Sequence, residues 1–317
     1  MIRLDEINQA QARIAPYLTP TPLEAAAGLG KDVWLKLENI NKTHSFKIRG
    51  ALNALLSLGE KARERGVIAA SSGNHAGALA YAAQLSGVSA QIFMPKTTPQ
   101  KKIANVRHCG AEAILFGDNY DEAESEALRR AGNPRVWISP YNDRAVIAGT
   151  GTIGLEILDQ LPEVARVIIP VSGGGLMAGV ATALKLRKPE IDIIGVNARS
   201  APALYNIFYS RHLPQVWDTL ADALSGEIEV GSITLPICLR HMDDIALVDE
   251  AGIAAAMRAM LAAGWVVEGG GAVGVAALLG NVSRAANGAT VVVLSGGNVD
   301  LSVLRRVLSP HLKWRGG

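Results

Sequence analysis

The chain has 317 residues, of which 49% are hydrophobic and 19% are charged. This balance supplies a packed core and excludes a disordered chain. The 31 Lys and Arg residues against 29 Asp and Glu residues leave a net charge of +2, which argues against nucleic acid or an anionic membrane surface as a partner.

Short β-branched runs alternate with longer helical runs along the chain. In chain order we predict strand 33–37, helix 46–58, strand 67–70, helix 74–85, strand 90–94, helix 100–108, strand 113–116, helix 120–131, strand 166–171, helix 176–186, strand 191–196, helix 253–263 and strand 290–294. Strands that alternate with helices of this length predict an α/β fold with doubly wound, mostly parallel sheets.

Three of the predicted strands are followed by a turn rich in Gly and Ser. The turns are Ser71-Ser72-Gly73-Asn74-His75, Ser172-Gly173-Gly174-Gly175-Leu176 and Ser295-Gly296-Gly297-Asn298. Small residues let a ligand approach the backbone, and free amides at a helix start favour an anion. The three turns together indicate a ligand that carries a phosphate and a carboxylate, although glycines that only pack a helix against a strand give the same pattern.

Lys47 opens a predicted helix in the segment Ser45-Phe46-Lys47-Ile48-Arg49-Gly50-Ala51. A cation is disfavoured at a helix N-terminus, and the apolar neighbours would desolvate the amine. Both effects would lower the pKa of Lys47 and make it a nucleophile. A lone Lys at a helix start is more often a solvated surface residue, so the surrounding motifs decide its interpretation.

With these motifs in this order, the chain resembles the threonine/serine dehydratase and serine racemase family of fold type II pyridoxal-phosphate (PLP) enzymes, whose fold is tryptophan synthase β-like. The resemblance covers about residues 5 to 305. It implies two doubly wound open-sheet domains with PLP between them. We expect a large PLP-binding domain from residues 1–56 and 144–317, and a small domain from residues 57–143.

The resemblance also implies roles for single residues. Lys47 would carry the cofactor covalently, Phe46 would pack near it, Asn74 would bind the ring hydroxyl and Ser295 would face the ring nitrogen. The phosphate would lie in the loop formed by Ser172, Gly173, Gly174, Gly175 and Leu176. The substrate carboxylate would be bound by Ser71, Ser72, Gly73 and His75, the last through its backbone amide.

Several of these residues could instead have a purely structural role, without any contact to cofactor or substrate. Asn74 could cap a helix, Ser295 could be a turn residue, and His75 could serve the fold alone. We expect Arg49 to form ion pairs in the first turn of its helix. Glu268 falls where the family places a Glu near the cofactor, without a direct catalytic role.

The implied reaction is β-elimination from a β-hydroxy-α-amino acid such as L-threonine or L-serine. Lys47 would remove the α-proton while the cofactor takes up the charge, and the β-hydroxyl would leave. Hydrolysis of the released product gives a 2-oxo acid and ammonia. In the racemase branch the residue equivalent to Ser72 handles a proton on the opposite face, so an amino-acid racemase is the alternative.

Many relatives bind a divalent cation through two carboxylates and a carbonyl. Here the corresponding positions are Asn197, Ala201 and Ala203, so we predict no metal at that place. This departure, together with the segments 220–228 and 267–274, is similar to the branch of hydroxyectoine-utilisation and phenylserine dehydratases. The substrate would then be bulkier than threonine, for example L-threo-phenylserine.

Two other classes of function fit the sequence less well. A non-catalytic PLP-binding sensor need not keep an activated amine at Lys47. A dinucleotide-dependent oxidoreductase needs the spacing Gly-x-Gly-x-x-Gly, which the loop 173–175 lacks.

The remaining expectations concern location and partners. The chain has no secretory apolar core at its N-terminus and no apolar run of the ~18 residues that a membrane span needs. Two cysteines, Cys109 and Cys238, do not make a disulfide framework. We therefore expect a cytoplasmic enzyme with a small amino-acid substrate and no membrane segment. The resemblance to the family also implies that the enzyme is a homodimer.

Overall fold

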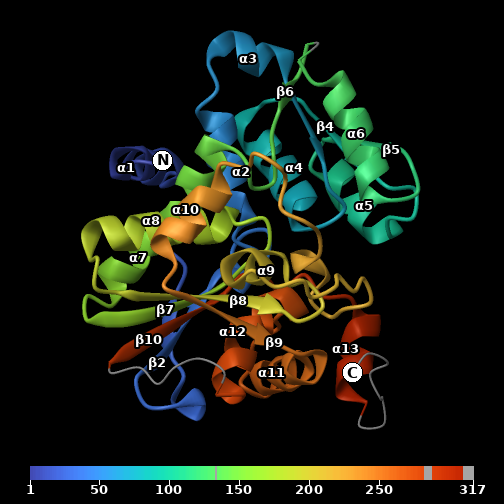
Figure 1. Ribbon diagram of the computed structural model, residues 1–317. Helices are drawn as coiled ribbons and strands as arrows, with labels where there is room; N and C mark the ends of the chain where they lie inside the picture. The colour runs from blue at the N-terminus through green and yellow to red at the C-terminus, as the bar shows by residue number, and fades with distance from the viewer. Residues whose placement is uncertain (133, 282–287, 310–317) are drawn as a thin grey trace.

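The computed structural model describes residues 1–132, 134–281 and 288–309, and it contains two sheets (Figure 1). The larger sheet has six strands in the order β1-β2-β10-β7-β8-β9. In chain order these are β1 (Leu23–Ala25), β2 (Val33–Leu37), β7 (Val164–Pro170), β8 (Asp192–Ala198), β9 (Asp244–Val248) and β10 (Ala289–Leu294). Only the edge strand β1 runs antiparallel to its neighbour, so the centre of this sheet is parallel.

The smaller sheet has four parallel strands in the order β5-β4-β3-β6. They are β3 (Val67–Ala70), β4 (Ala90–Met94), β5 (Glu112–Leu115) and β6 (Val136–Trp137). Its strands all come from one stretch in the first half of the chain. Figure 1 shows this smaller sheet above the six-stranded sheet.

Helices cover both faces of the six-stranded sheet. One face carries α1 (Leu4–Ile14), α7 (Arg144–Gln160), α8 (Gly175–Arg187) and α10 (Thr234–His241). The other carries α11 (Glu250–Ala262), α12 (Gly269–Leu279) and α13 (Leu301–Leu308), and α9 (Ala203–Tyr209) follows β8. Successive residues of β7 alternate between the two cores: Val167 and Ile169 face α7 and α8, whereas Ile168 faces α12. This burial on both sides explains the unbroken apolar run of the strand.

The four-stranded sheet is covered in the same way. Helices α2 (Lys47–Leu56), α4 (Asn74–Ser86) and α5 (Gln100–His108) share a core with Ala69 of β3. Helix α6 (Tyr120–Arg130) covers the opposite face, where Ile68 and Ala70 point. Helix α3 (Glu60–Arg65) leads into β3, and the short 3₁₀ turns are η1 (Ala27–Leu29), η2 (Glu38–Ile40) and η3 (Asp222–Leu224). The prediction of doubly wound sheets is therefore confirmed.

Every strand and helix predicted from the sequence is present, with ends that agree to within three residues. Helix α7 was not predicted, because it is apolar on nearly all sides and carries three glycines instead of an amphipathic stripe. At position 149 the close packing of α7 on α2 requires glycine, because a Cβ there would lie 2.5 Å from the carbonyl oxygen of Arg49 in α2.

The division into residues 1–56 with 144–317 and residues 57–143 stays a prediction. The strands sort between the two sheets at these positions, but α2 contributes to the core of the smaller sheet. Within the part of the chain that the structure describes, no helix has the length and apolar character needed to cross a membrane.

Candidate active site

Lys47 is the first residue of α2 and lies beside Ser295, which follows β10. Ser45 and Gly296 form an antiparallel bridge, and the backbone N–H of Phe46 donates to the carbonyl oxygen of Ser295 at 3.0 Å. Two predicted site residues from distant parts of the chain are thus joined at the carboxyl end of a parallel strand, where open α/β sheets bind ligands.

The amine of Lys47 is held between a carbonyl and an aromatic ring. Its Nζ donates to the carbonyl oxygen of Pro140 at 2.8 Å and lies 5.1 Å from the centre of the Phe46 ring. Desolvation lowers the pKa of Lys47 to about 8, and the nearby carboxylate of Glu268 opposes this shift. A substantial neutral fraction therefore exists near neutral pH, which is the form that acts as nucleophile or base.

Asn74 begins α4 but does not cap it with its side chain, because the N-cap residue is Gly73. The side-chain Nδ2 of Asn74 donates to Oε1 of Glu268 at 2.7 Å, and its Oδ1 accepts from Nδ2 of Asn298 at 2.8 Å. The structure therefore excludes the helix-cap alternative. Asn74 instead joins the smaller sheet to the start of α12 and the turn after β10.

Glu268 is the buried acceptor in this network, with 6% of its surface exposed. Burial raises its pKa to about 7, and the charge of Asp222 acts in the same direction. The amide of Asn74 favours the ionised form. Glu268 therefore touches Asn74 directly and lies within electrostatic reach of Lys47.

The loop before α8 offers free backbone amides. The N–H groups of Ser172, Gly173 and Gly174 make no hydrogen bond to any residue that the structure describes. The carbonyl oxygens of Gly173 and Gly174 are occupied by α10, where Thr234 Oγ1 donates at 2.6 Å and Cys238 Sγ at 3.5 Å. Gly174 has a φ of +85°, which favours glycine. Free amides at the start of a 13-residue helix form an anion site.

Some of the backbone N–H groups in the turn after β3 already have hydrogen-bond partners within the protein. The N–H of Ser71 donates to the carbonyl of Phe93 at 3.0 Å, and the N–H of Gly73 donates to Ser71 Oγ at 3.2 Å. Ser72 makes no hydrogen bond to the described residues, and a Cβ on Gly73 would meet open space. Ser72 is thus the member of this turn with a free amide and a free hydroxyl.

The ring of His75 is structural. It is 3% exposed, and its Nε2 lies 3.3 Å from the carbonyl oxygen of Ile138. Burial, and then the charge of Lys47, lower the pKa of His75 to about 3, so the ring is neutral at pH 7. A contact to the substrate would have to come from its backbone amide, which is the contact that the resemblance implies.

Ser295 is 5% exposed, and its hydroxyl makes no hydrogen bond within residues 1–132, 134–281 and 288–309. Residues 172–175, before and at the start of α8, form the glycine loop. Leu176, the second residue of α8, is buried in the core beside it. The predicted residues therefore converge from both sheets, and the donors that a ligand would need are left unused.

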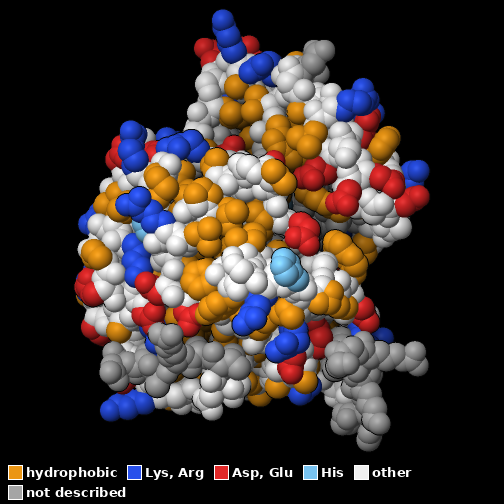
Figure 2. Space-filling model, in the orientation of Figure 1, with side chains coloured by type: hydrophobic (Ala, Val, Ile, Leu, Met, Phe, Trp, Pro, Cys, Tyr) orange, Lys and Arg blue, Asp and Glu red, His pale blue; other side chains and the backbone are white. Residues whose placement is uncertain are grey.

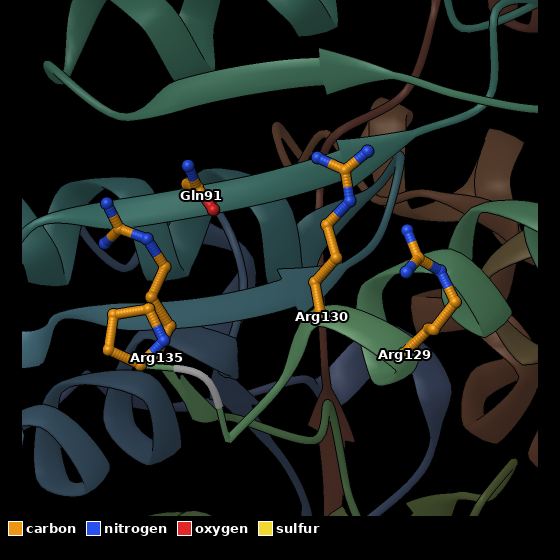
Figure 3. Close-up of a pocket in the computed structure, with 5 residues that line it drawn as sticks. Gln91, Arg129, Arg130 and Arg135 are labelled. Carbon is orange, nitrogen blue, oxygen red and sulfur yellow. The ribbon is translucent and has the colours of Figure 1, made fainter.

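A separate cavity of about 450 Å³ lies at the other end of the four-stranded sheet (Figure 3). It is lined by Gln91, Arg129, Arg130, Pro134 and Arg135. Both Arg129 and Arg130 pair with Glu126, and Arg135 donates to Ser89 Oγ at 2.9 Å. Arg129 and Arg130 lie in the last turn of α6, Arg135 precedes β6, and all three have partners of their own, so the cavity is not part of the candidate site.

The sequence pattern of the family described as pyridoxal-phosphate dependent enzyme matches residues 14–297. The chain belongs to this family of PLP-dependent enzymes. It is 41% identical to an L-threonine ammonia-lyase of Thermotoga maritima, over 98% of this chain and 79% of that protein. It is 40% identical to a catabolic L-threonine dehydratase of Staphylococcus aureus, over 98% of this chain and 93% of that one.

Solved structures agree with the fold of this PLP enzyme. Maize serine racemase superposes with a TM-score of 0.89 and 35% identity, covering 96% of both chains. The processed form of threonine deaminase isoform 2 from Solanum lycopersicum gives a TM-score of 0.87 and 37% identity, covering 96% of this chain and 87% of that one. The prediction of fold type II with PLP as cofactor is confirmed.

The residues present fit PLP. Its phosphate matches the free amides of the glycine loop, and its aldehyde matches a half-buried amine at Lys47 whose pKa is about 8. The uncharged hydroxyl of Ser295 has no partner among the described residues. The assignment of each residue to a part of the cofactor or substrate stays a prediction.

Asn197 occupies one of the positions at which many relatives carry a cation-binding carboxylate. It is fully buried, its Nδ2 donates to the carbonyl of Val171 at 2.8 Å, and its Oδ1 accepts from the N–H of Tyr205 at 2.9 Å. Both polar atoms of the side chain are thus used within the fold.

Three residues of the site could not be read from the sequence as participants. Pro140 acts through a backbone carbonyl, Tyr141 packs on the glycine loop, and Asn298 donates to Asn74. Pro140 and Tyr141 lie in a turn that has no glycine, and Pro140 acts through its backbone, so only the fold reveals them. Asn298 was visible as part of the third turn, without a role.

Proposed function

We propose that this PLP enzyme is an ammonia-lyase that eliminates the β-hydroxyl of a β-hydroxy-α-amino acid of the L-threonine or L-serine type. The products are a 2-oxo acid and ammonia. The half-buried amine of Lys47, held at 2.8 Å from a carbonyl oxygen with a pKa of about 8, carries this proposal, because elimination needs a base next to the substrate α-carbon. The L-threonine ammonia-lyase of Thermotoga maritima, 41% identical, supports it.

Each residue has a task in this proposal. Lys47 binds the cofactor and takes the α-proton of the substrate. The loop of Ser172, Gly173, Gly174, Gly175 and Leu176 binds the phosphate through its backbone amides, and Phe46, Asn74 and Ser295 position the ring. PLP supplies an electron sink for the charge that remains when the α-proton leaves.

The substrate carboxylate binds at the turn formed by Ser71, Ser72 and Gly73 and the amide of His75. Ser72 contributes most, because its amide and hydroxyl are free of other partners in the described chain. The hydroxyl of Ser295 is neutral, so it does not keep the ring nitrogen protonated. A neutral group at this position would favour β-elimination over transamination.

The size of the substrate is the finer part of the proposal. Asn197 with Ala201 and Ala203, and the segments 220–228 and 267–274, support the branch that takes bulkier substrates such as L-threo-phenylserine or an intermediate of hydroxyectoine breakdown. The test is the release of 2-oxo acid from PLP-loaded protein with L-threonine, L-serine and L-threo-phenylserine at equal concentrations. Turnover of phenylserine alone supports the bulky branch, and fast turnover of threonine contradicts it. No release from any of the three contradicts the dehydratase proposal.

An amino-acid racemase is the second candidate. The free side chain of Ser72 favours it, because a hydroxyl on the face opposite Lys47 can exchange a proton with the α-carbon. Maize serine racemase, with a TM-score of 0.89, has the same fold. Chiral analysis of the L-serine recovered after partial turnover separates the two: D-serine supports racemisation, and its absence leaves elimination alone.

We also propose a cytoplasmic homodimer. Hydrophobic side chains gather in the centre of the face that α9 and α10 present (Figure 2). Ile207, Tyr209 and Leu239 are each about two-fifths exposed there. Light scattering after size-exclusion chromatography tests this point, and a mass equal to one chain of 33.3 kDa contradicts it.

A further inference from the structure

Tyr141 lies in the turn that connects β6 to α7, and this turn is tightly held. The N–H groups of Tyr141 and Asn142 both point to Ser139 Oγ, at 3.4 and 2.9 Å. Asp143 then caps α7 by accepting from the N–H of Val146 at 2.9 Å. The position of the Tyr141 backbone is therefore fixed at both ends of the turn.

The ring of Tyr141 packs against the glycine loop. A Cβ added to Gly173 would lie 2.7 Å from three carbons of the ring, and one added to Gly175 would lie 2.8 Å from Cβ of Tyr141. Contacts this short do not occur between real side chains, so Tyr141 requires glycine at both positions. The opposite side of the loop is covered by Thr234 and Cys238 of α10.

The hydroxyl of Tyr141 makes a different contact. Its oxygen accepts from the backbone N–H of Glu229 at 3.2 Å. The neighbouring Asn142 reinforces this link, since its Nδ2 donates to Glu229 Oε2 and its Oδ1 accepts from the N–H of Ile233, both at 2.9 Å. Two hydrogen bonds thus fasten the mostly exposed segment of residues 226–231 to this turn through Glu229, and a third holds Ile233 just beyond it.

The same turn also reaches Lys47. The carbonyl oxygen that accepts from Nζ of Lys47 belongs to Pro140, the residue before Tyr141. One turn therefore contacts the reactive amine, the loop with the free amides and the segment 226–231.

We propose that Tyr141 is a positioning residue with two separable tasks. Its ring holds the glycine loop in the conformation that binds phosphate, and its hydroxyl holds the segment 226–231 against the turn whose Pro140 carbonyl accepts from the amine of Lys47. The inference rests on the proposed role of the glycine loop as the phosphate site.

Two variants separate the tasks. Tyr141→Ala removes the ring, and Tyr141→Phe keeps the ring but loses the hydroxyl. Phe208→Ala is the matched control, because its ring is also half-buried but belongs to α9, where it packs against the core between the larger sheet and its helices. Affinity is measured on apo protein, as the absorbance change on adding PLP, and again in competition with inorganic phosphate.

Tyr141→Ala should weaken PLP binding by about tenfold or more, which is the usual size for residues that orient a binding group. Phosphate should compete less well by a similar factor. Tyr141→Phe should keep the PLP affinity of the wild type and raise KM for the amino acid with little change in kcat. Phe208→Ala should keep both values.

Unchanged PLP affinity in Tyr141→Ala would overturn the role of the ring, and unchanged KM in Tyr141→Phe would overturn that of the hydroxyl. If Tyr141→Ala does not fold, Gly173→Ala replaces it, because its methyl group pushes against the same ring. PLP affinity falls in that variant if the contact sets the loop, and equal affinity contradicts the proposal. Failure of the wild type to bind PLP at all would instead refute the proposed function.

Discussion

The reactivity of a single amine depends on two neighbours at the residue scale. The lowered pKa of Lys47, about 8, follows from its removal from water, and Glu268 limits the shift with its negative charge. Glu268 in turn owes its raised pKa to burial. The pKa of the Lys47 amine is therefore coupled to the charge of Glu268, which is itself set by how deeply that carboxyl is buried.

This coupling predicts how cofactor uptake depends on pH. Only the neutral amine attacks an aldehyde, so the rate at which apo protein takes up PLP should rise with pH through a midpoint near 8. Glu268→Gln removes the charge that raises the pKa of Lys47, so its midpoint should move to lower pH. Stopped-flow absorbance between pH 6.5 and 9.5 measures both.

The control for this measurement is Asp192→Asn, which removes a carboxylate at the other end of the six-stranded sheet, paired with Arg166. Its midpoint should equal that of the wild type. An upward shift in Glu268→Gln would contradict the electrostatic account.

Ser295 supports a second prediction at this scale. Its hydroxyl is neutral and 5% exposed, whereas a carboxylate there would keep the ring nitrogen of PLP protonated. Ser295→Asp should therefore divert part of the turnover from elimination to transamination, seen as accumulation of the amine form of the cofactor. Ser295→Thr is the control with a retained hydroxyl. An unchanged ratio of products in Ser295→Asp would refute this role.

At the scale of elements, a buried charge network holds the helix that begins with Lys47. The guanidinium of Arg49 bonds Glu38 of η2 and Glu156 of α7, and Lys36 of β2 also bonds Glu156. Two cations and two anions share this network, and Arg49 is 1% exposed. The sequence predicted ion pairing by Arg49, but its two carboxylate partners lie on η2 and α7, far away along the chain in the case of α7, and could not be named before folding.

Removing the guanidinium leaves two buried carboxylates short of a partner. Arg49→Met should therefore lower the free energy of unfolding by about 3–5 kcal/mol, measured by urea titration. Arg129→Met removes an exposed guanidinium that pairs with Glu126, and it should change stability little. Equal effects of the two variants would show that burial of the network does not matter.

Contact between α2 and α7 gives a prediction about glycine. A Cβ on Gly149 would lie 2.5 Å from a backbone oxygen of α2, whereas a Cβ on Gly77 in α4 would have no atom within 4 Å. Gly149→Ala should cost roughly 1–3 kcal/mol of stability, because the backbone must move. Gly77→Ala should add about 0.4–1 kcal/mol, because it restricts the unfolded chain. Thermal unfolding measures both, and a stabilised Gly149→Ala would contradict the packing.

These elements also show what the sequence reveals and what it hides. Strands such as 67–70 and 90–94 were predicted at the residues where they occur, because a buried parallel strand is a short apolar run between turns. Helices α7 and α12 escaped prediction, because they are apolar or glycine-rich on every side. Lys47 and Ser295 were visible in local motifs. Tyr141 and the Asn74–Glu268 bond depend on contacts between distant segments, which no local motif encodes.

At the scale of the whole molecule, the site lies where the two sheets meet. The hydrogen bonds from Asn74 to Glu268 and from Asn298 to Asn74 join α4 of the smaller sheet to the larger one. Lys47 is placed at the same junction, since α2 shares the core of the smaller sheet while Phe46 bonds the turn after β10. The reactive groups are thus positioned by contacts between the sheets, made by the protein itself.

The same reasoning predicts that the enzyme does not depend on a divalent cation. Residues 1–132, 134–281 and 288–309 hold no group of three or more His, Cys, Asp or Glu side chains that could bind a metal ion. Asn197 links the end of β8 to Val171, the residue before the glycine loop, and to the start of α9. The hydrogen-bonded amide of Asn197 therefore holds the end of β8, Val171 and the start of α9 together without a cation, and these three segments form one corner of the fold.

Incubation of PLP-loaded protein with EDTA, followed by removal of the chelator, should leave kcat and the melting temperature unchanged. Added Mg²⁺ or Ca²⁺ should have no effect either. Asn197→Asp should lower the melting temperature, because a carboxylate in place of Nδ2 turns a donor toward Val171 into a second acceptor. Loss of activity in EDTA that Mg²⁺ restores would show that a cation acts elsewhere in the chain. Full stability of Asn197→Asp would show that the amide does not hold this corner.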